Sequence, residues 1–542
     1  MYKRMLSISI IVLFSFIFII VLSNNFNSKK IINNNGATYA ITLDGEKVNE
    51  FPNKGSYKVE VNCENANGKW LYDEWKLAIE NIEGTNAFCD VNFTSGSTTY
   101  LNNYITSLVG TSQGDGKVTS EVATTPNYNS SQPISRSEYL NVETFSSNSS
   151  SLNGTTTPST GVFTFSGNQW STNSSAMSDG TYYHLQFNLK DAGYYQICYD
   201  IGIGNSYNYV YTYVDYSTRK RLDASRNEVI SECIDLGYIS SNNYVRVVQK
   251  ADNSTNGGTG GFAEINFSIQ KAQSTAQTNA GIRYSGINPN NYIWFNNELW
   301  RIIGVFDSNT HGQTGQHLVK IIRNDTLGGL VWNTVADDRQ WSTSTLKELL
   351  NNYYYNSADA SNTQYCYGWS STVSSNCNYL ETGINNLYRP MIKNVIWYLG
   401  GYSTSAATAE WFFNIEHSGE FLPEENDKFT SGYIGLMYVS DYGFSAFDDS
   451  CKKTIGLSSF GNSPCSENNW LYKNGYEWTI TQYTDTSSYA SRIRVMIIDT
   501  NGSISSGILN YGSSTRPVLY LDSSVYILDG DGSITNPYII GM

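Results

Sequence analysis

The stretch YIWFNNELWRIIGVF, residues 292–306, decides the fold of the C-terminal part of the chain. Aromatic and β-branched residues fill both of its halves, which is typical of strands. Asn296 and Asn297 separate the halves, and asparagine tolerates the positive φ of a tight hairpin turn. Two further apolar runs, residues 476–481 and 515–521, close the same region. Strands at both ends of a long, loop-rich region predict a sheet that brings those ends together.

This C-terminal module is predicted to span residues 281–542 and to be α+β. Residues 318–323 are a further apolar strand. Thr343 or Ser344 is a candidate N-cap for a helix that carries Leu346, and residues 385–398 are a second helix candidate. Between them lies a long irregular middle, and such stretches inside a compact domain are usually functional or tied by disulfides.

A β-sandwich of jelly-roll type is predicted for residues 135–272. Apolar residues alternate with polar ones in several short runs there, for example at Leu185, Phe187 and Leu189, and loops rich in Asn, Gly and Ser separate the runs. Residues 273–280 are polar and are predicted to form a short linker.

Four segments precede the sandwich. Residues 1–23 are basic and then apolar, which favours a signal anchor or transmembrane helix, and residues 24–36 form a polar spacer. A small disulfide-tied β-domain is expected over residues 37–95. Residues 96–134 are predicted to hold one short helix and then a flexible linker. The predicted fold class is therefore multidomain and mainly β, behind an N-terminal transmembrane helix.

The anchor sets the expected location. Lys3 and Arg4 keep the N-terminus inside, so the bulk of the chain is expected to be extracellular, with the membrane as one partner. A cleaved signal peptide is the alternative, although no clear small-residue cleavage site follows the apolar run.

The eight cysteines fall into four neighbouring couples. Long cysteine-free gaps separate the couples, so each is expected to close locally as a disulfide, although spacing alone does not prove connectivity. The couples are Cys63 with Cys89, Cys198 with Cys233, Cys366 with Cys377, and Cys451 with Cys465.

Composition excludes one class of partner. The formal net charge is -14 and the pI is about 4.8, whereas nucleic-acid binding demands basic surfaces. The 42 tyrosines favour strands and binding surfaces instead.

Several motifs resemble those of an uncharacterised family of surface proteins from Gram-positive gut bacteria. They are residues 300–305 (WRIIGV), 434–443 (IGLMYVSDYG), 478–481 (WTIT), 516–521 (RPVLYL) and 530–533 (GDGS). The C-terminal module is more loosely similar to the C-type-lectin-like fold shared with formylglycine-generating enzymes. This resemblance implies a surface protein with a lectin-like module.

The chemistry of those relatives does not carry over in full. A formylglycine-type oxidase needs a cysteine pair near its C-terminal end, and no cysteine follows Cys465. Calcium-dependent lectins of this fold use an ordered acidic loop, which residues 422–426 (LPEEN) do not reproduce. We therefore expect no catalytic residues, no metal ligands and no cofactor, with calcium as the one alternative kept open.

The function expected from the sequence is that of a cell-surface, adhesin-like binding protein. Its ligand would be a glycan or a host or neighbour surface protein, and large aromatic side chains in loops would supply the contacts. A surface hydrolase acting on glycans and a passive envelope stalk are the alternatives. The candidate contact residues are Trp369, Trp411, Tyr442 and Trp470.

Overall fold

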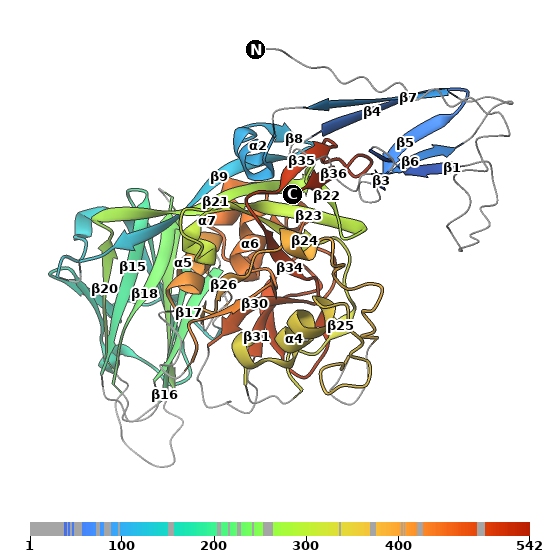
Figure 1. Ribbon diagram of the computed structural model, residues 1–542. Helices are drawn as coiled ribbons and strands as arrows, with labels where there is room; N and C mark the ends of the chain where they lie inside the picture. The colour runs from blue at the N-terminus through green and yellow to red at the C-terminus, as the bar shows by residue number, and fades with distance from the viewer. Residues whose placement is uncertain are drawn as a thin grey trace, which may run out of the picture. The chain divides into compact units, whose positions relative to one another are not determined.

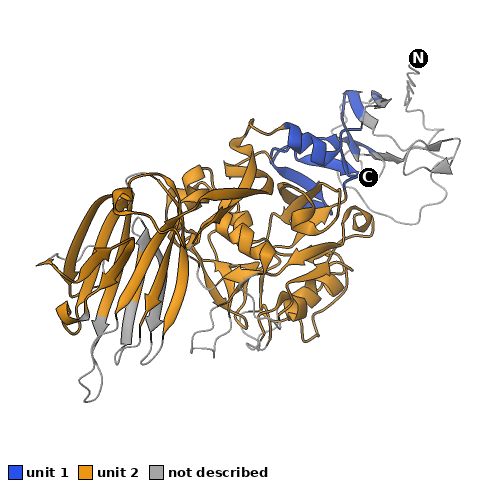
Figure 2. Cartoon of the chain, turned by 90° about the vertical axis from the view of Figure 1, so that its left-hand side faces the viewer, with its two compact units in different colours: residues 1–107, 291–299, 523–542 blue, residues 108–290, 300–522 orange. Residues whose placement is uncertain are grey.

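The computed structural model of the protein is mainly β, and its strands form several sheets (Figure 1). The residues that the structure describes are 37–40, 42–43, 46–47, 57–71, 76–80, 88–95, 98–129, 131–149, 157–202, 207–214, 217–224, 229–240, 243–252, 264–334, 338–368, 376–402, 405, 407–419, 426–484 and 494–542. Two compact units are distinguished in Figure 2: residues 1–107, 291–299 and 523–542 form unit 1, and residues 108–290 and 300–522 form unit 2.

Unit 1 contains the small β-domain that the sequence predicts. Trp70, Leu77, Ile79, Cys89 and Val91 form its buried core. Its three sheets are β1 (Ala37–Ala40) with β6 (Lys76–Glu80) and β5 (Asn67–Leu71), β2 (Thr42–Leu43) with β3 (Glu46–Lys47), and β4 (Tyr57–Glu64) with β7 (Phe88–Ser95).

The short helix expected near residue 101 is also present in unit 1. This helix, α2 (Leu101–Ser107), buries Leu101 and Ile105. The unit is completed by β22 (Tyr292–Phe295), β35 (Tyr526–Asp529) and β36 (Tyr538–Gly541), in which β36 pairs with both others. Asn296 and Asn297 follow β22 with φ of 56° and 59°, which confirms the predicted tight turn.

The main sheet of unit 2 is built from strands that lie far apart in the sequence. Its order is β29 (Ile434–Gly435), β34 (Val518–Leu521), β24 (Leu318–Arg323), β23 (Glu298–Phe306), β21 (Ser274–Asn288), β9 (Asp115–Asn127) and β8 (Ser112–Gln113). The two ends of the C-terminal module therefore meet in one sheet, because β24 pairs with β23 on one side and with β34 on the other.

The prediction of linkers within residues 96–134 and at residues 273–280 is wrong, because most of these residues lie in paired strands. They form β9 and β21, which pair antiparallel from Asp115 with Asn288 to Asn127 with Ser274. Main-chain hydrogen bonds hold this ladder together although many of its side chains are polar, and its fully buried side chains include Val118, Ala123, Ala280 and Tyr284. The sandwich is consequently an insertion between two adjacent strands of the main sheet.

The sandwich itself is confirmed, and it consists of two antiparallel sheets. The six-stranded sheet has the order β11 (Thr157–Pro158), β10 (Tyr139–Ser147), β14 (Tyr182–Leu189), β19 (Tyr244–Asp252), β16 (Tyr207–Val214) and β17 (Ser217–Ala224). The five-stranded sheet has the order β12 (Phe163–Ser166), β13 (Gln169–Thr172), β20 (Ile265–Lys271), β15 (Gly193–Ile201) and β18 (Ile230–Ile239). Leu185 and Phe187 of one sheet share a core with Ile197 and Phe267 of the other. Two short 3-10 turns, Arg136–Glu138 and Ser174–Ala176, flank its strands.

The remainder of unit 2 combines a second sheet with short helices. The sheet contains β25 (Gly329–Leu330), β33 (Ser513–Ser514), β30 (Glu477–Tyr483), β31 (Arg494–Ile498), β32 (Ile504–Ile508) and β27 (Gly401–Tyr402). The helices are α3 (Ser308–His311), α4 (Thr345–Glu348), α5 (Ala409–Ser418), α6 (Val439–Phe444), α7 (Asp449–Lys453) and α8 (Pro464–Glu467). Single turns Trp341–Thr343, Leu349–Tyr354, Arg389–Met391 and Leu457–Ser459 complete the unit.

One of the two helix predictions in this module is confirmed and the other is wrong. The side chain of Ser344 accepts a hydrogen bond from Lys347 N at 3.1 Å and caps α4. Residues 385–398 form no long helix; the single turn Arg389–Met391 leads into β26 (Val395–Tyr398), which pairs with β28 (Phe429–Gly432). Pro390 is the second residue of that turn, and the β-branched Val395 and Ile396 favour the strand.

All four predicted disulfides are present. Cys63–Cys89 and Cys198–Cys233 link residues that lie opposite each other on paired strands, and Cys366–Cys377 and Cys451–Cys465 close short loops of the module. Four disulfides are typical of a protein that folds in an oxidising, extracellular compartment.

The predicted anchor, residues 1–23, and the spacer, residues 24–36, lie outside the described residues. Within the part of the chain that the structure describes, no helix combines the length and the apolar character that a membrane span requires.

Candidate functional site

Helix α5 positions the most distinctive side chains of unit 2. Thr408 begins it as N-cap, with its hydroxyl accepting a hydrogen bond from Trp411 N at 3.3 Å, and Gly419 ends it in the left-handed region at φ 64°. Asn414 of the same helix donates to Thr124 O of β9 at 3.0 Å, which fixes the helix against the strand. Glu410 and Trp411 lie in the first turn of this helix, and the hydrogen bond from Asn414 therefore fixes their position relative to β9.

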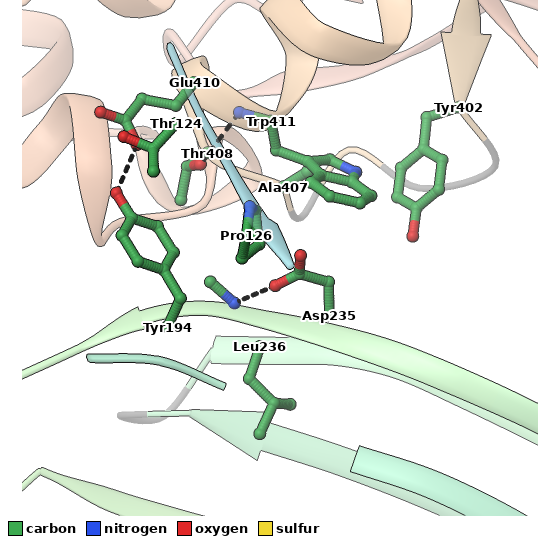
Figure 3. Close-up of a pocket in the computed structure, with 11 residues that line it drawn as sticks. Thr124, Pro126, Tyr194, Asp235, Leu236, Tyr402, Ala407, Thr408, Glu410 and Trp411 are labelled. Carbon is green, nitrogen blue, oxygen red and sulfur yellow. Dashed lines mark hydrogen bonds between the residues drawn. The ribbon is translucent and has the colours of Figure 1, made fainter. Parts of the chain in front are cut away.

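A groove lies between this helix turn, the end of β9 and the sandwich (Figure 3). It contains about 480 Å³ of empty space, and this volume includes space that is open to solvent. Its lining residues are Thr124, Pro126, Tyr194, Asp235, Leu236, Gly237, Tyr402, Ala407, Thr408, Glu410 and Trp411.

Glu410 is the buried acid of the groove. Only 3% of the residue is exposed, and its Oε2 accepts a hydrogen bond from the Tyr194 hydroxyl at 2.9 Å. Burial raises the pKa of its carboxyl to about 7, against the opposing effects of the Tyr194 hydrogen bond and of Lys453. Its Oε1 is buried and has no hydrogen-bond partner among the described residues. The group is therefore poised between a neutral and a charged state near neutral pH.

Asp235 is the second acid, and it comes from the sandwich. Its Oδ1 accepts hydrogen bonds from Gly237 N at 2.5 Å and from the Tyr128 hydroxyl at 3.2 Å. These two donors orient the half-buried carboxylate, and Figure 3 shows it pointing toward the Trp411 ring.

Trp411 and Tyr402 form the aromatic wall of the groove. Both are half-buried, and their ring centroids lie 6.0 Å apart at an interplanar angle of 70°. Of the four aromatic residues predicted to contact a ligand, Trp411 is thus placed on a concave surface, but in a helix rather than in a loop.

The other predicted contact residues are placed differently. Tyr442 is fully buried in α6, where its hydroxyl donates to Gly502 O at 2.6 Å. Trp470 is 3% exposed; its indole N–H donates to Tyr284 O at 3.0 Å, and the Arg301 guanidinium lies 4.5 Å above its ring. The prediction of exposed contacts is wrong for these two residues, because both fill the core of the module. Trp369 lies outside the described residues.

Sequence reasoning missed Tyr194, Asp235 and Tyr402. They are separated from Glu410 by up to 216 residues, and each sits in an ordinary strand pattern without a motif. The insertion of the sandwich beside β9 brings Tyr194 and Asp235 to α5, whereas Tyr402 comes from β27 of the module itself. The burial of Glu410 has no signal in the sequence either.

A second cluster of titratable groups fills the core of the module. The Asp441 carboxylate accepts hydrogen bonds from Arg283 at 2.7 Å and from Lys320 at 2.5 Å, and all three side chains are at most 2% exposed. Glu416 lies nearby, and burial raises its pKa to about 7. The Lys320 ammonium is enclosed by aromatic rings, among them Tyr438 at 4.4 Å. This cluster stabilises the core and offers no access for a ligand.

The histidines provide no metal centre. His184, His311 and His417 are buried or partly buried, and burial lowers the pKa of each to about 4. In the described part of the chain, no group of three or more His, Cys, Asp or Glu side chains is arranged to hold a metal ion.

Comparisons with known proteins do not identify a family for this chain. No family model matches the chain, and no curated protein matches it. Among solved structures, the secreted serine protease VesC from Vibrio cholerae is similar at 10% identity with a TM-score of 0.16, over 45% of this chain and 43% of that protein. The chain thus spans less than half the length of that neighbour, and a likeness of this size carries no argument about fold or chemistry.

Proposed function

We propose that the protein is an extracellular, adhesin-like binding protein that uses the groove beside α5 as a ligand site. The observation that carries the proposal is the meeting of Trp411 and Tyr402 with the carboxyl groups of Asp235 and Glu410 in one concave place. Flat aromatic faces pack against the C–H groups of sugars and side chains, and carboxylates accept hydrogen bonds from hydroxyl or amino groups. A glycan or a surface protein is the expected ligand.

Three further expectations belong to the same proposal. Residues 1–23 would anchor the protein in the membrane, and the resemblance to a lectin-like fold would describe the C-terminal module. Calcium would have no part in binding, so chelation would leave affinity unchanged.

The test is a glycan and mucin array probed with the full-length protein, with and without EDTA. The Trp411→Ala variant is expected to lose about two- to tenfold in affinity, because a stacked aromatic contact contributes about 0.5–1.5 kcal/mol. Trp294→Ala is the matched control, since Trp294 is 36% exposed and does not line the groove.

Two results would count against this function. Equal losses in both variants would show that Trp411 has no special role in binding. If no glycan or mucin on the array binds, the expected ligand becomes a protein. A pull-down from neighbouring cell surfaces with the same two variants then tests for that protein.

One observation favours a hydrolase as the second candidate. A carboxyl group with a pKa of about 7 and an oriented carboxylate lie in the same groove, as a general acid and its partner do in glycosidases. Against this, Glu410 is 3% exposed and already accepts the Tyr194 hydrogen bond. Release of reducing sugar that disappears in Glu410→Gln, with binding retained, would favour the hydrolase.

A further inference from the structure

The lining of the groove has a marked electrostatic preference. It contains two acidic residues, Asp235 and Glu410, and no lysine or arginine among the described residues that line it. The aromatic side chains add to this, because the faces of tyrosine and indole rings carry partial negative charge. The acidic side chains and the ring faces that line the groove therefore favour a cation over an anion.

We propose that the groove binds an organic ammonium group, with the Trp411 and Tyr402 rings beside its alkyl substituents and Asp235 as its counter-charge. This inference rests on the proposed function and names the chemistry of the ligand. A quaternary ammonium, the amino group of a sugar and the side chain of a lysine share that chemistry.

The geometry of the two rings fits such a group. Trp411 and Tyr402 meet at 70° with centroids 6.0 Å apart, so they form a corner rather than a flat stack. Aromatic corners and cages hold ammonium groups within about 6 Å of each ring centroid. The Asp235 carboxylate enters the same space from the sandwich, as Figure 3 shows, and its two hydrogen-bond donors keep it in place.

A second, independent observation that favours a bound cation in this groove comes from Glu410. Its Oε1 is buried without a hydrogen-bond partner among the described residues, which is costly for a carboxyl oxygen. The groups that face it are the Tyr194 hydroxyl, Lys453 of α7 and Glu121 of β9. Glu121 is itself paired with the buried Lys452, so it adds no uncompensated negative charge beside Glu410.

Other ligand classes fit less well. An acidic sugar would meet two carboxyl groups, and no basic side chain is among the described residues that line the groove. A neutral sugar would pack on Trp411 equally well but would gain no charge attraction from Asp235. An ammonium ligand uses both the rings and the carboxylates.

The experiment compares choline with 3,3-dimethyl-1-butanol, its uncharged isostere, by calorimetry on the full-length protein at pH 7.5. Choline is expected to bind about five- to thirtyfold more tightly, which corresponds to the about 1–2 kcal/mol of a cation–π contact. Asp235→Asn, which keeps the side-chain shape, is expected to remove most of that difference. Asp115→Asn is the matched control, because it removes the same charge from the far, exposed end of β9.

A second arm identifies the source of the ammonium group. Glucosamine and N-acetylglucosamine differ in charge on the same ring, so tighter binding of glucosamine than of choline assigns an amino sugar. The reverse order assigns a quaternary head group. Tighter binding of Nα-acetyl-lysine amide than of either assigns a lysine side chain.

The pH dependence adds a readout that a purely structural role of Glu410 would not produce. A bound cation favours the charged form of Glu410, so the affinity for choline is expected to rise several-fold from pH 6 to pH 8, below the limit of about tenfold per pH unit. Glu410→Gln is expected to flatten this profile. A flat profile in the unmodified protein would remove Glu410 from the site.

The remaining outcomes separate the inference from the proposed function. Equal affinity for choline and its isostere, or equal affinity for the two sugars, overturns the ammonium site. Trp411-dependent binding of a neutral glycan without any preference for ammonium also overturns it, but leaves the binding function standing. Binding of neither class overturns both.

Discussion

At the scale of single residues, Glu410 shows two opposing effects on one carboxyl group. It lies in the first turn of α5, where the helix dipole favours a charged carboxylate by about 0.3–1 kcal/mol. Burial acts in the other direction and raises its pKa from 4.5 to about 7, which corresponds to a few kcal/mol at about 1.4 kcal/mol per unit. Burial therefore dominates, and the folded protein keeps this proton up to a higher pH than the unfolded chain does.

A pH-dependent stability difference follows from this shift. A carboxyl group whose pKa is higher in the folded state stabilises the protein below the unfolded value, near 4.5, and loses that contribution as the pH rises through 7. Glu410→Gln removes the titration. Its melting temperature is expected to match that of the unmodified protein at pH 4.5 and to exceed it at pH 8, by the equivalent of about 1–3 kcal/mol.

The measurement is thermal unfolding of both proteins across that pH range. Glu381→Gln, at an exposed position, is the control for the loss of a surface charge. A constant difference between Glu410→Gln and the unmodified protein at all pH values would contradict the raised pKa.

The buried ion cluster gives a second prediction at this scale. Asp441→Asn leaves the charges of Arg283 and Lys320 buried without their carboxylate, and is expected to cost about 3–5 kcal/mol. Lys320→Met keeps the Arg283–Asp441 pair and places an apolar chain among aromatic rings, so it is expected to cost clearly less. Urea denaturation measures the free energy of unfolding of the two variants. A larger loss in Lys320→Met than in Asp441→Asn would show that Lys320, not Asp441, contributes most to the stability of the cluster.

At the scale of elements, the paired strands β9 and β21 connect the sandwich to the module. Asn127 and Ser274 are opposite partners in the ladder, so the chain leaves and re-enters the main sheet at one point. The ladder has its own main-chain hydrogen bonds, and residues of the module such as Asn414 pack against it. The module therefore does not need the sandwich to complete its sheet.

Excision of the insertion tests this directly. Removal of residues 128–273, with Asn-Gly joining Asn127 to Ser274, closes the ladder with a two-residue hairpin turn. The shortened protein is expected to fold, with cooperative thermal unfolding and the disulfides Cys63–Cys89, Cys366–Cys377 and Cys451–Cys465 intact. An aggregated or non-cooperative product would show that the sandwich is part of the module's core.

The same elements show where sequence reasoning succeeds. Apolar alternation identified the sandwich strands such as β14, and the Asn296–Asn297 turn and the Ser344 cap were local enough to be predicted. Strands β9 and β21 were missed because their Ser, Thr and Gly content is typical of linkers, while their pairing is a long-range property of the main chain. The groove was missed except for Trp411, since it depends on that same pairing.

At the scale of the whole molecule, the four disulfides hold separate parts of the chain rather than linking them to one another. The first lies in the small domain of unit 1, the second in the sandwich, and the other two in the C-terminal module. Each closes a loop of 11–35 residues, so each restricts the unfolded chain only locally and contributes about 2–4 kcal/mol to its own part.

Thiol labelling checks this arrangement. The denatured, unreduced protein is expected to take up no iodoacetamide, and the reduced protein is expected to take up eight equivalents, as counted by mass spectrometry. Reduction is expected to lower the melting temperature of every part. Any labelled cysteine before reduction would contradict the pairing.

The adjacency of Asn127 and Ser274 also has a practical meaning for protein engineering. Partners in an antiparallel ladder have Cα atoms about 4.5–5.5 Å apart, and many independently folded bodies have termini that can be brought to such a spacing. The end of the β9–β21 ladder is therefore an insertion site, where a fluorescent protein or a different binding domain could replace the sandwich without interrupting any other strand.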